Sequence, residues 1–176
     1  GIHDGHNASA CVLENGEIKF AIQEERFTYE KNQGGLPFSS INYIKDEFSI
    51  QKDDVIGFVT KYLPTHDWTK RTVLDTYNKS DSSTNILRHH LKNYKFIYQL
   101  YSLQSNKPRL RKISNLFPEN KVVFVEHHLC HAATAYYGLG NFDEDILIIT
   151  ADGDGDKEAG AVYLGKNGEL KELLNL

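Results

Sequence analysis

The chain has 176 residues, of which 40% are hydrophobic and 25% charged, so a disordered or collagen-like chain is excluded. A formal net charge of −4 provides no overall attraction to nucleic acid or to anionic lipid. The longest apolar runs, such as Val122–Val125 and Ile146–Ile149, are far shorter than the ~20 residues that a membrane span needs. We therefore expect a cytoplasmic protein with no nucleic-acid partner and no membrane contact.

The cysteine count and the ends of the chain add two expectations. Cys11 and Cys130 are too few for a disulfide framework and lack metal-finger spacing, which agrees with a reducing compartment. The chain contains no methionine, opens directly at Gly1 and closes within what reads as the middle of an element. We expect it to be a piece of a longer protein.

Strands and one helix are expected in the first sixty residues. Asn15-Gly16 stands between two runs with alternating apolar residues, which is the strongest short-range signal for a β-hairpin. Ser39 and Ser40 can cap the helix that follows. The expected elements are strands Ser9–Leu13 and Ile18–Phe27, a helix Ile41–Phe48 and a strand Val55–Thr60.

The rest of the chain alternates between helices and strands, which predicts an α/β fold. Residues 61–85 form a polar excursion, and residues 86–117 have helical apolar spacing that Pro108 interrupts. The further expected elements are a strand Lys121–Val125, a helix Leu129–Tyr137 that Gly138 ends, and a strand Asp145–Thr150.

One pattern occurs near both ends of the chain, with a period of about 150 residues. An acidic-glycine turn at Asp4-Gly5 leads to a hairpin at Asn15-Gly16, and the turn at Asp152-Gly153 leads likewise to Asn167-Gly168. Such turns present backbone N–H groups and a carboxylate that can hold a phosphate and its metal, although each alone reads equally as an ordinary hairpin connection. Two facing turns would form a nucleotide cleft. The expected contacts to the nucleotide are Asp4, Gly5, Asn7, Ser9, Gly153, Asp154 and Gly155.

Three residues form a candidate metal site. His127 and His131 stand one helical turn apart, so both imidazoles can bind one divalent ion, while His128 points elsewhere. Asp152, at the end of a strand, offers a carboxylate oxygen as a third ligand. The alternative is that the two histidines are ordinary polar residues at the start of a helix.

Three further side chains are candidates for catalysis or for binding the substrate. His6, in the first acidic-glycine turn, could act as a general base, although a turn network explains it as well. Arg26 and Lys31 could bind an anionic oxygen, and a solvated strand end is the alternative. The sequence has no phosphate-binding GxxxxGK[ST] loop, no GxGxxG motif and no Ser-His-Asp arrangement.

Five segments of the sequence resemble the O-carbamoyltransferases, a family that includes nodulation-factor and antibiotic carbamoyltransferases. They follow the order of the family's motifs and are spread over nearly all 176 residues. The segments are Gly1–Ser9, Glu24–Thr28, Gly34–Pro37, Glu126–Ala133 and Asp152–Gly155.

The resemblance implies an actin-like (ASKHA, ribonuclease H-like) domain, similar to that of the threonylcarbamoyl-transferases that modify transfer RNA. Residues 1–144 would form the first subdomain, with the excursion 61–85 and a helical insertion 86–117, and residues 145–176 would begin the second. The family's reaction has two stages. A C-terminal domain makes carbamoyl-adenylate from carbamoyl phosphate and ATP, and the actin-like domain transfers the carbamoyl group to a hydroxyl of a small-molecule acceptor.

The resemblance also implies roles for single residues. His127, His131 and Asp152 match the family's ligands for an iron-type divalent metal, and a further aspartate ligand normally comes from later sequence. His6 matches the catalytic histidine, and Lys31 matches a basic substrate contact. The chain departs from the family at Asn7, where relatives often have aspartate, and at Tyr29-Glu30, which is less basic than usual.

Two other interpretations remain open. A non-catalytic actin-like nucleotide-binding module would share the repeat and the cleft but would not need the metal site. A closer relation to the threonylcarbamoyl or hydrogenase-maturation branch would change the acceptor, and the segment Glu24–Thr28 argues against it. We do not expect this piece alone to turn over.

Overall fold

The computed structural model describes residues 1–60, 107–156 and 158–176. The predicted polar excursion, and the predicted helical insertion as far as residue 106, lie outside the described residues.

Contacts along the backbone divide the chain into two compact units. The first unit consists of Gly1–Phe58 and Tyr62–Val123, and the second of Val59–Lys61 and Phe124–Leu176. The subdomain boundary between residues 144 and 145 was inferred from the resemblance to actin-like domains, and it stays a prediction.

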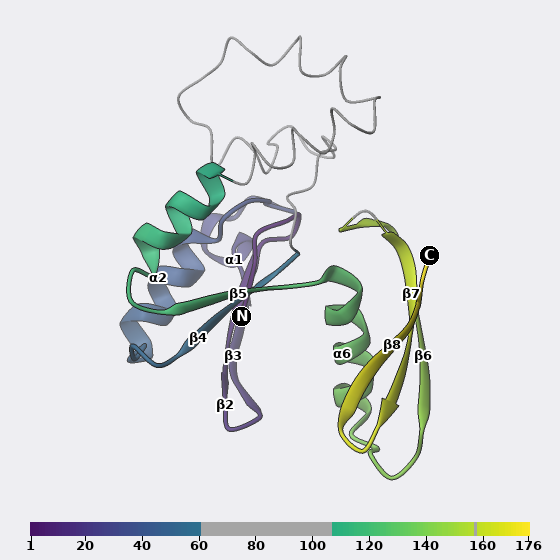
Figure 1. Ribbon diagram of the computed structural model, residues 1–176. Coiled ribbons are helices and arrows are strands. Elements are labelled where there is room, and N and C mark those ends of the chain that lie inside the picture. The colour runs from purple at the N-terminus through teal and green to yellow at the C-terminus, as the bar shows by residue number, and fades with distance from the viewer. Residues whose placement is uncertain (61–106, 157) are drawn as a thin grey trace, which may run out of the picture. The chain divides into compact units, whose positions relative to one another are not determined.

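A five-stranded mixed sheet has the strand order β3-β2-β1-β4-β5. β1 pairs antiparallel with β2 and parallel with β4, and β2 pairs antiparallel with β3 (Figure 1). With its flanking helices, this sheet confirms the predicted α/β class, whereas the actin-like assignment stays a prediction. The strands are β1 Ile2–His3, β2 Ser9–Glu14, β3 Glu17–Gln23, β4 Val55–Val59 and β5 Lys121–Val125.

The β2–β3 hairpin turns where the sequence predicts. Asn15 and Gly16 have φ values of 52° and 81°, the left-handed pair that a two-residue hairpin turn requires. The prediction that the second strand reaches Phe27 is wrong, because β3 ends at Gln23 and a short helix, α1, occupies Glu25–Thr28. The chain turns at Glu24, whose side chain is only 2% exposed.

Helix α2 spans Phe38–Glu47, three residues earlier at its start than predicted. The predicted cap by Ser39 and Ser40 is wrong, because those residues lie within the helix. The carboxylate of Glu24 accepts hydrogen bonds from the amides of Ser39 and Ser40, both at 2.8 Å, and from the Ser40 hydroxyl at 2.7 Å. A buried carboxylate from another element thus satisfies the amides that a helix start leaves unpaired.

Residues 107–116 are helical, Pro108 included. Arg109 from this segment is 1% exposed and forms two hydrogen bonds of 2.8 Å, from Nε and Nη2, to the two carboxylate oxygens of Asp4. Asp4 is itself fully buried. The bidentate pair therefore joins the first acidic-glycine turn to a helix more than a hundred residues later in the chain.

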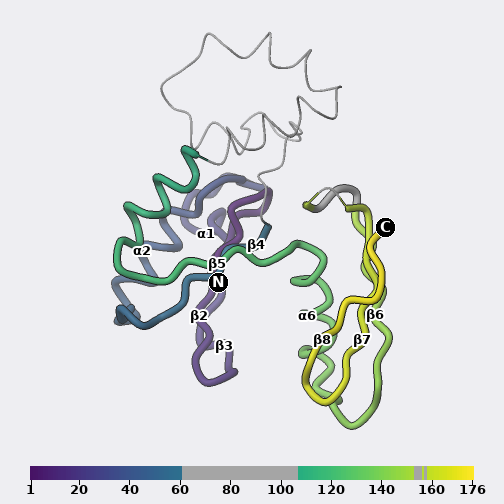
Figure 2. The backbone as a smooth tube through the Cα atoms, in the orientation of Figure 1, coloured from purple at the N-terminus to yellow at the C-terminus, as the bar shows by residue number. Residues whose placement is uncertain are grey.

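The second unit is a three-stranded antiparallel sheet with one helix packed on it. β6 (Ile146–Gly155), β7 (Glu158–Lys166) and β8 (Glu169–Asn175) form a meander, and α6 (His127–Leu139) lies along β6 and β7 (Figure 2). No helix of the described ranges is long and apolar enough to cross a membrane. The core between helix and sheet consists of Ala132, Tyr136, Ile148, Ala161 and Tyr163.

Helix α6 is longer than the predicted Leu129–Tyr137. It begins at His127 and runs through Gly138, the predicted end, to Leu139. Gly140 ends it in the left-handed conformation, with φ 66°, which glycine adopts without steric cost.

The predicted repeat is visible in the backbone. Strand β1 is followed by a turn and then by the β2–β3 hairpin. Strand β6 is likewise followed by a turn and then by the β7–β8 hairpin. Asn167 and Gly168, with φ 51° and 80°, repeat the conformation of Asn15 and Gly16 within 1°. The two ends of the chain therefore have the same local architecture.

We expect Arg109→Met to lower the free energy of unfolding of the full-length protein by about 3–5 kcal/mol, because the buried Asp4 carboxylate loses its counter-charge. Arg111→Met is the matched control, since Arg111 is exposed on the same helix, and its effect should stay within about 0.5 kcal/mol. Urea unfolding followed by circular dichroism measures both. Equal losses would contradict a structural role of the pair.

We expect Gly165→Ala to destabilise the second unit by about 1–3 kcal/mol. A Cβ atom at Gly165 would lie 2.5 Å from two ring carbons of the buried Tyr136. Gly138→Ala, with nothing within 4 Å of its new Cβ, should instead raise stability by about 0.5–1 kcal/mol as a helix substitution. Thermal unfolding of the two variants should shift in opposite directions, and a shift in the same direction would refute the close contact.

Candidate metal centre

The start of α6 is fixed by two carboxylates. Glu126 is the N-cap, and its side chain accepts hydrogen bonds from the amides of His128 at 2.7 Å and Leu129 at 2.6 Å. Asp156 accepts the amide of His127 at 2.9 Å. The first turn of the helix therefore has its amides satisfied and its positive end neutralised, which holds His127 within the helix.

The three predicted metal ligands lie together in the second unit. Nε2 of His127 lies 2.8 Å from Oδ2 of Asp152 and 3.0 Å from Nε2 of His131, and Nε2 of His131 lies 3.4 Å from the same carboxylate oxygen. All three atoms fall within 4.8 Å of one another. The two histidines, one helical turn apart, thus meet Asp152 as the sequence predicts, although Asp152 lies within β6 and not at the strand end that was expected.

These distances fit a shared cation. Ligand atoms about 2.1 Å from a metal are separated by about 3.0 Å in an octahedral and about 3.4 Å in a tetrahedral arrangement. Two imidazole nitrogens and one carboxylate oxygen form a donor set that suits iron and zinc. The His127 side chain is 10% exposed, whereas those of His131 and Asp152 are 53% and 38% exposed, so one side of the cluster opens to solvent.

The ring of His127 makes its polar contacts on the cluster side. Its Nδ1 atom is buried and has no hydrogen-bond partner among the described residues, while Nε2 faces His131 and Asp152. The planes of the His127 and His131 rings are inclined at 81°, with centroids 4.6 Å apart. The two nitrogens therefore converge edge to face rather than stacking.

His128 points away from the cluster, as predicted. It is fully buried, and its Nδ1 and Nε2 atoms lie 3.0 Å from the Thr150 hydroxyl and 3.1 Å from the Glu158 carbonyl oxygen. Its immediate role is to attach α6 to β6 and β7.

Burial and the nearby carboxylates change several pKa values. Burial alone raises the pKa of Glu126, but the amides of His128 and Leu129 and the Tyr163 hydroxyl outweigh it and lower the pKa. Burial, followed by the charge of Glu126, raises the pKa of Tyr163. Burial, with the charges of Glu126 and Asp156, raises the pKa of Cys130 to about 11. The region around the histidines therefore carries excess negative charge, which favours a bound cation.

The predicted nucleotide contacts at the start of the chain lie in the first unit. Asp4 is paired with Arg109, and Gly5 is covered by the ring of His3, whose Nε2 donates a hydrogen bond to the His6 carbonyl oxygen at 2.8 Å. Asn7 has a left-handed φ of 54°. Ser9 begins β2 opposite His3.

The predicted catalytic residues His6 and Lys31 are both exposed in the first unit. Their loops are joined by two backbone hydrogen bonds, from Gly35 to the Gly5 carbonyl at 2.9 Å and from Ala8 to the Gln33 carbonyl at 2.8 Å. The segment containing Gly34–Pro37 is buried and thus supports the turn that carries His6.

The remaining predicted contacts, Gly153, Asp154 and Gly155, lie in the last residues of β6 rather than in a turn beyond it. The strand runs five residues further than the predicted Thr150, and its pairing with β7 becomes irregular between Ala151 and Gly155.

Several residues that shape these turns could not be recognised from their local sequence. Arg109, Glu24 and Thr150 are all buried polar side chains distant in sequence from their partners. The acid at Glu126, directly before the histidines, is the one local signal that could have indicated a helix start.

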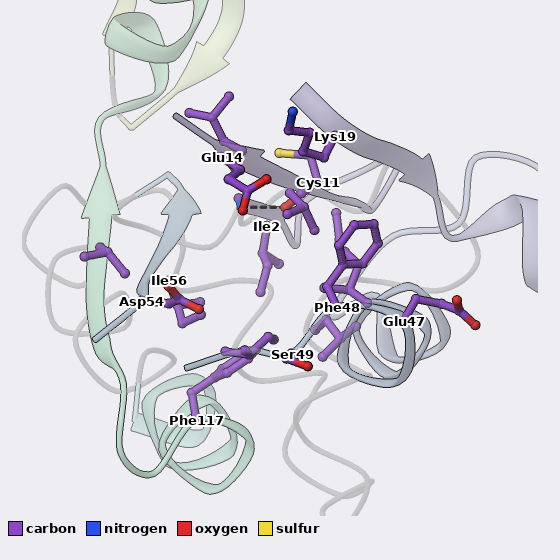
Figure 3. A pocket seen from close by; sticks show the side chains of 18 residues that line it. Ile2, Cys11, Glu14, Lys19, Glu47, Phe48, Ser49, Asp54, Ile56 and Phe117 are labelled. Atoms are coloured by element: carbon purple, nitrogen blue, oxygen red, sulfur yellow. Dashed lines mark hydrogen bonds between the residues drawn. The ribbon is translucent and has the colours of Figure 1, made fainter. Parts of the chain in front are cut away.

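A cavity of about 500 Å³ lies elsewhere in the first unit (Figure 3). Ile2, Ile41, Ile56 and Phe117 are among its apolar lining residues, and Glu14 and Lys19 are among its polar ones. None of the predicted site residues lines it.

Comparison with known proteins identifies relatives over almost the whole chain. Residues 1–175 match the family described as carbamoyltransferase N-terminus. An uncharacterised protein of Methanocaldococcus jannaschii is 30% identical over 89% of this chain and 22% of its own length. The nodulation protein NolNO of Sinorhizobium fredii is 27% identical over 96% of this chain and 22% of its own length. An uncharacterised protein of Synechocystis is 29% identical over 94% of this chain and 26% of its own length, so the chain spans about a quarter of these relatives.

We expect Cys130 to react slowly with iodoacetamide at pH 8, because a pKa of about 11 leaves very little thiolate. Alkylation of its peptide, followed by mass spectrometry, should be at least tenfold slower in the folded metal-free protein than in 8 M urea, where the pKa returns to about 8.5. The rate in the folded protein should rise towards pH 11. Equal rates in the two states would show that burial and the carboxylates do not act on this thiol.

Proposed function

The chain belongs to the carbamoyltransferase N-terminal family, and we propose that it forms the N-terminal part of an enzyme that transfers a carbamoyl group to a hydroxyl of a small molecule. The donor is carbamoyl-adenylate, which a C-terminal domain of the same full-length chain makes from carbamoyl phosphate and ATP. The partners are therefore ATP, carbamoyl phosphate and a hydroxyl-bearing acceptor.

The observation that carries the proposal is the convergence of His127, His131 and Asp152 on one point. A module that only binds a nucleotide does not need three ligand atoms within 4.8 Å and an open side, whereas a transferase that handles a charged leaving group does. We assign these residues to a divalent metal, Fe²⁺ in view of the two imidazoles and one carboxylate. When bound, the ion supplies positive charge that offsets the charge developing on the leaving adenylate.

We assign the other functions to residues of the first unit and to the last residues of β6. His6, exposed beside His3, takes the proton of the acceptor hydroxyl as general base, and Lys31 contacts an anionic oxygen of the substrate. Asp4 is held by Arg109, so we give it the task of shaping the turn that binds the adenylate. Gly5, Asn7, Ser9, Gly153, Asp154 and Gly155 complete the proposed nucleotide contacts, chiefly through backbone groups.

The test combines metal content with transfer in the full-length protein. We expect His127→Ala and Asp152→Asn to lower bound iron at least tenfold and to abolish transfer of label from [¹⁴C]carbamoyl phosphate to a panel of hydroxyl acceptors. His6→Asn should keep its iron and lose about 10²–10⁴-fold in transfer rate. Asp143→Asn is the control, because Asp143 is an exposed aspartate of the second unit that lies shortly before β6. Unchanged iron in His127→Ala would remove the site assignment.

A further inference from the structure

His128 is a buried polar side chain that the proposed reaction does not use. It stands between two proposed metal ligands in α6, is fully buried, and contacts β6 through Thr150 and β7 through Glu158. A buried imidazole is compatible with a stable fold when both of its nitrogens have hydrogen-bond partners, because each unpaired buried nitrogen lowers the free energy of unfolding.

The partners of His128 fix its protonated nitrogen. The Glu158 carbonyl can only accept, so Nε2 donates to it at 3.1 Å, and Nδ1 pairs with the Thr150 hydroxyl at 3.0 Å. Thr150 in turn accepts the amide of Ala161 at 3.0 Å. The imidazole of His128, the Thr150 hydroxyl and the backbone of Ala161 thus form a chain of hydrogen bonds across helix and sheet.

The geometry ties this chain to the metal cluster. Thr150 and Asp152 are two residues apart in β6, where alternate side chains share a face, and they meet the neighbouring helix residues His128 and His127. One contact would let the helix rotate about it. Two adjacent contacts fix both the rotation and the height of α6 against β6.

We propose that His128 is a positioning residue for the metal centre: through Thr150 it holds α6 against β6 so that His127 and His131 reach Asp152. This inference rests on the proposed function, because it assumes that the cluster binds an ion. His128 itself binds no metal, since both of its nitrogens are engaged elsewhere. The hydrogen bond to Thr150, more than the bond to Glu158, is the part that matters, because Thr150 belongs to the strand that carries Asp152.

Variants of His128 separate the two hydrogen bonds. The amide oxygen of Asn stands near the place of Nδ1 and can accept from Thr150, whereas the amide nitrogen of Gln stands near Nε2 and can donate to the Glu158 carbonyl. We expect His128→Asn to keep Co²⁺ affinity within about threefold, and His128→Gln to lower it at least tenfold. Thr150→Val should lose the same factor and Thr150→Ser should retain affinity. The double variant His128→Gln/Thr150→Val should be no worse than the worse single variant.

The experiment uses metal-free full-length protein, titrated with Co²⁺ against a chelator, with the visible spectrum of bound Co²⁺ as a second readout of ligand geometry. Gly165→Ala is the control for general instability, because it disturbs the packing of α6 on β7 without touching His128 or Thr150. The proposal requires weaker binding and an altered spectrum in His128→Gln and Thr150→Val, but not in Gly165→Ala.

The outcomes separate the inference from the proposed function. If His127→Ala binds Co²⁺ as the unchanged protein does, the metal assignment itself fails. If His127→Ala loses Co²⁺ but Thr150→Val and His128→Gln bind it normally, only the positioning role fails. Should the His128 variants not fold, the pair Thr150→Ser and Thr150→Val still decides, since equal affinity in these two overturns the proposal.

Discussion

The candidate site depends on the residue at which α6 begins. Had the helix begun at Leu129, His127 would lie before it and the spacing of four residues would not place both imidazoles on one face. Glu126 prevents this, because its carboxylate accepts the amides of His128 and Leu129, while Asp156 accepts the amide of His127. The capping of one helix turn thus creates the pair of nitrogens that meets Asp152.

The same carboxylates give the region its electrostatic character. Glu126 and Asp156 lie at the positive end of α6, and burial together with their charge raises the pKa of Cys130. A negative environment favours a cation and holds the imidazoles beside carboxylate oxygens that can bind it. The capping of α6 and the proposed metal binding therefore depend on the same carboxylates, which ties the stability of the second unit to its proposed chemistry.

The features that could be predicted from the sequence are those that a local pattern of residues determines. The turns at Asn15-Gly16 and Asn167-Gly168, the strands beside them and the meeting of His127, His131 and Asp152 follow from residue type and spacing. The ends of helices α2 and α6 did not, since their capping carboxylates, Glu24 and Glu126, are not the usual serine or threonine. Arg109 was beyond prediction for another reason: its partner Asp4 stands more than a hundred residues away in the sequence.

The two copies of the repeated turn show how one backbone pattern supports two uses. In the first copy the aspartate, Asp4, is fully buried and its two oxygens are held by Arg109, so its charge serves the fold. In the second copy the corresponding aspartate, Asp152, is 38% exposed, and its Oδ2 atom faces two imidazole nitrogens. What differs is the partner: Asp4 is paired with a permanently charged guanidinium, whereas Asp152 lies beside two imidazoles, the other two donors of the proposed metal site.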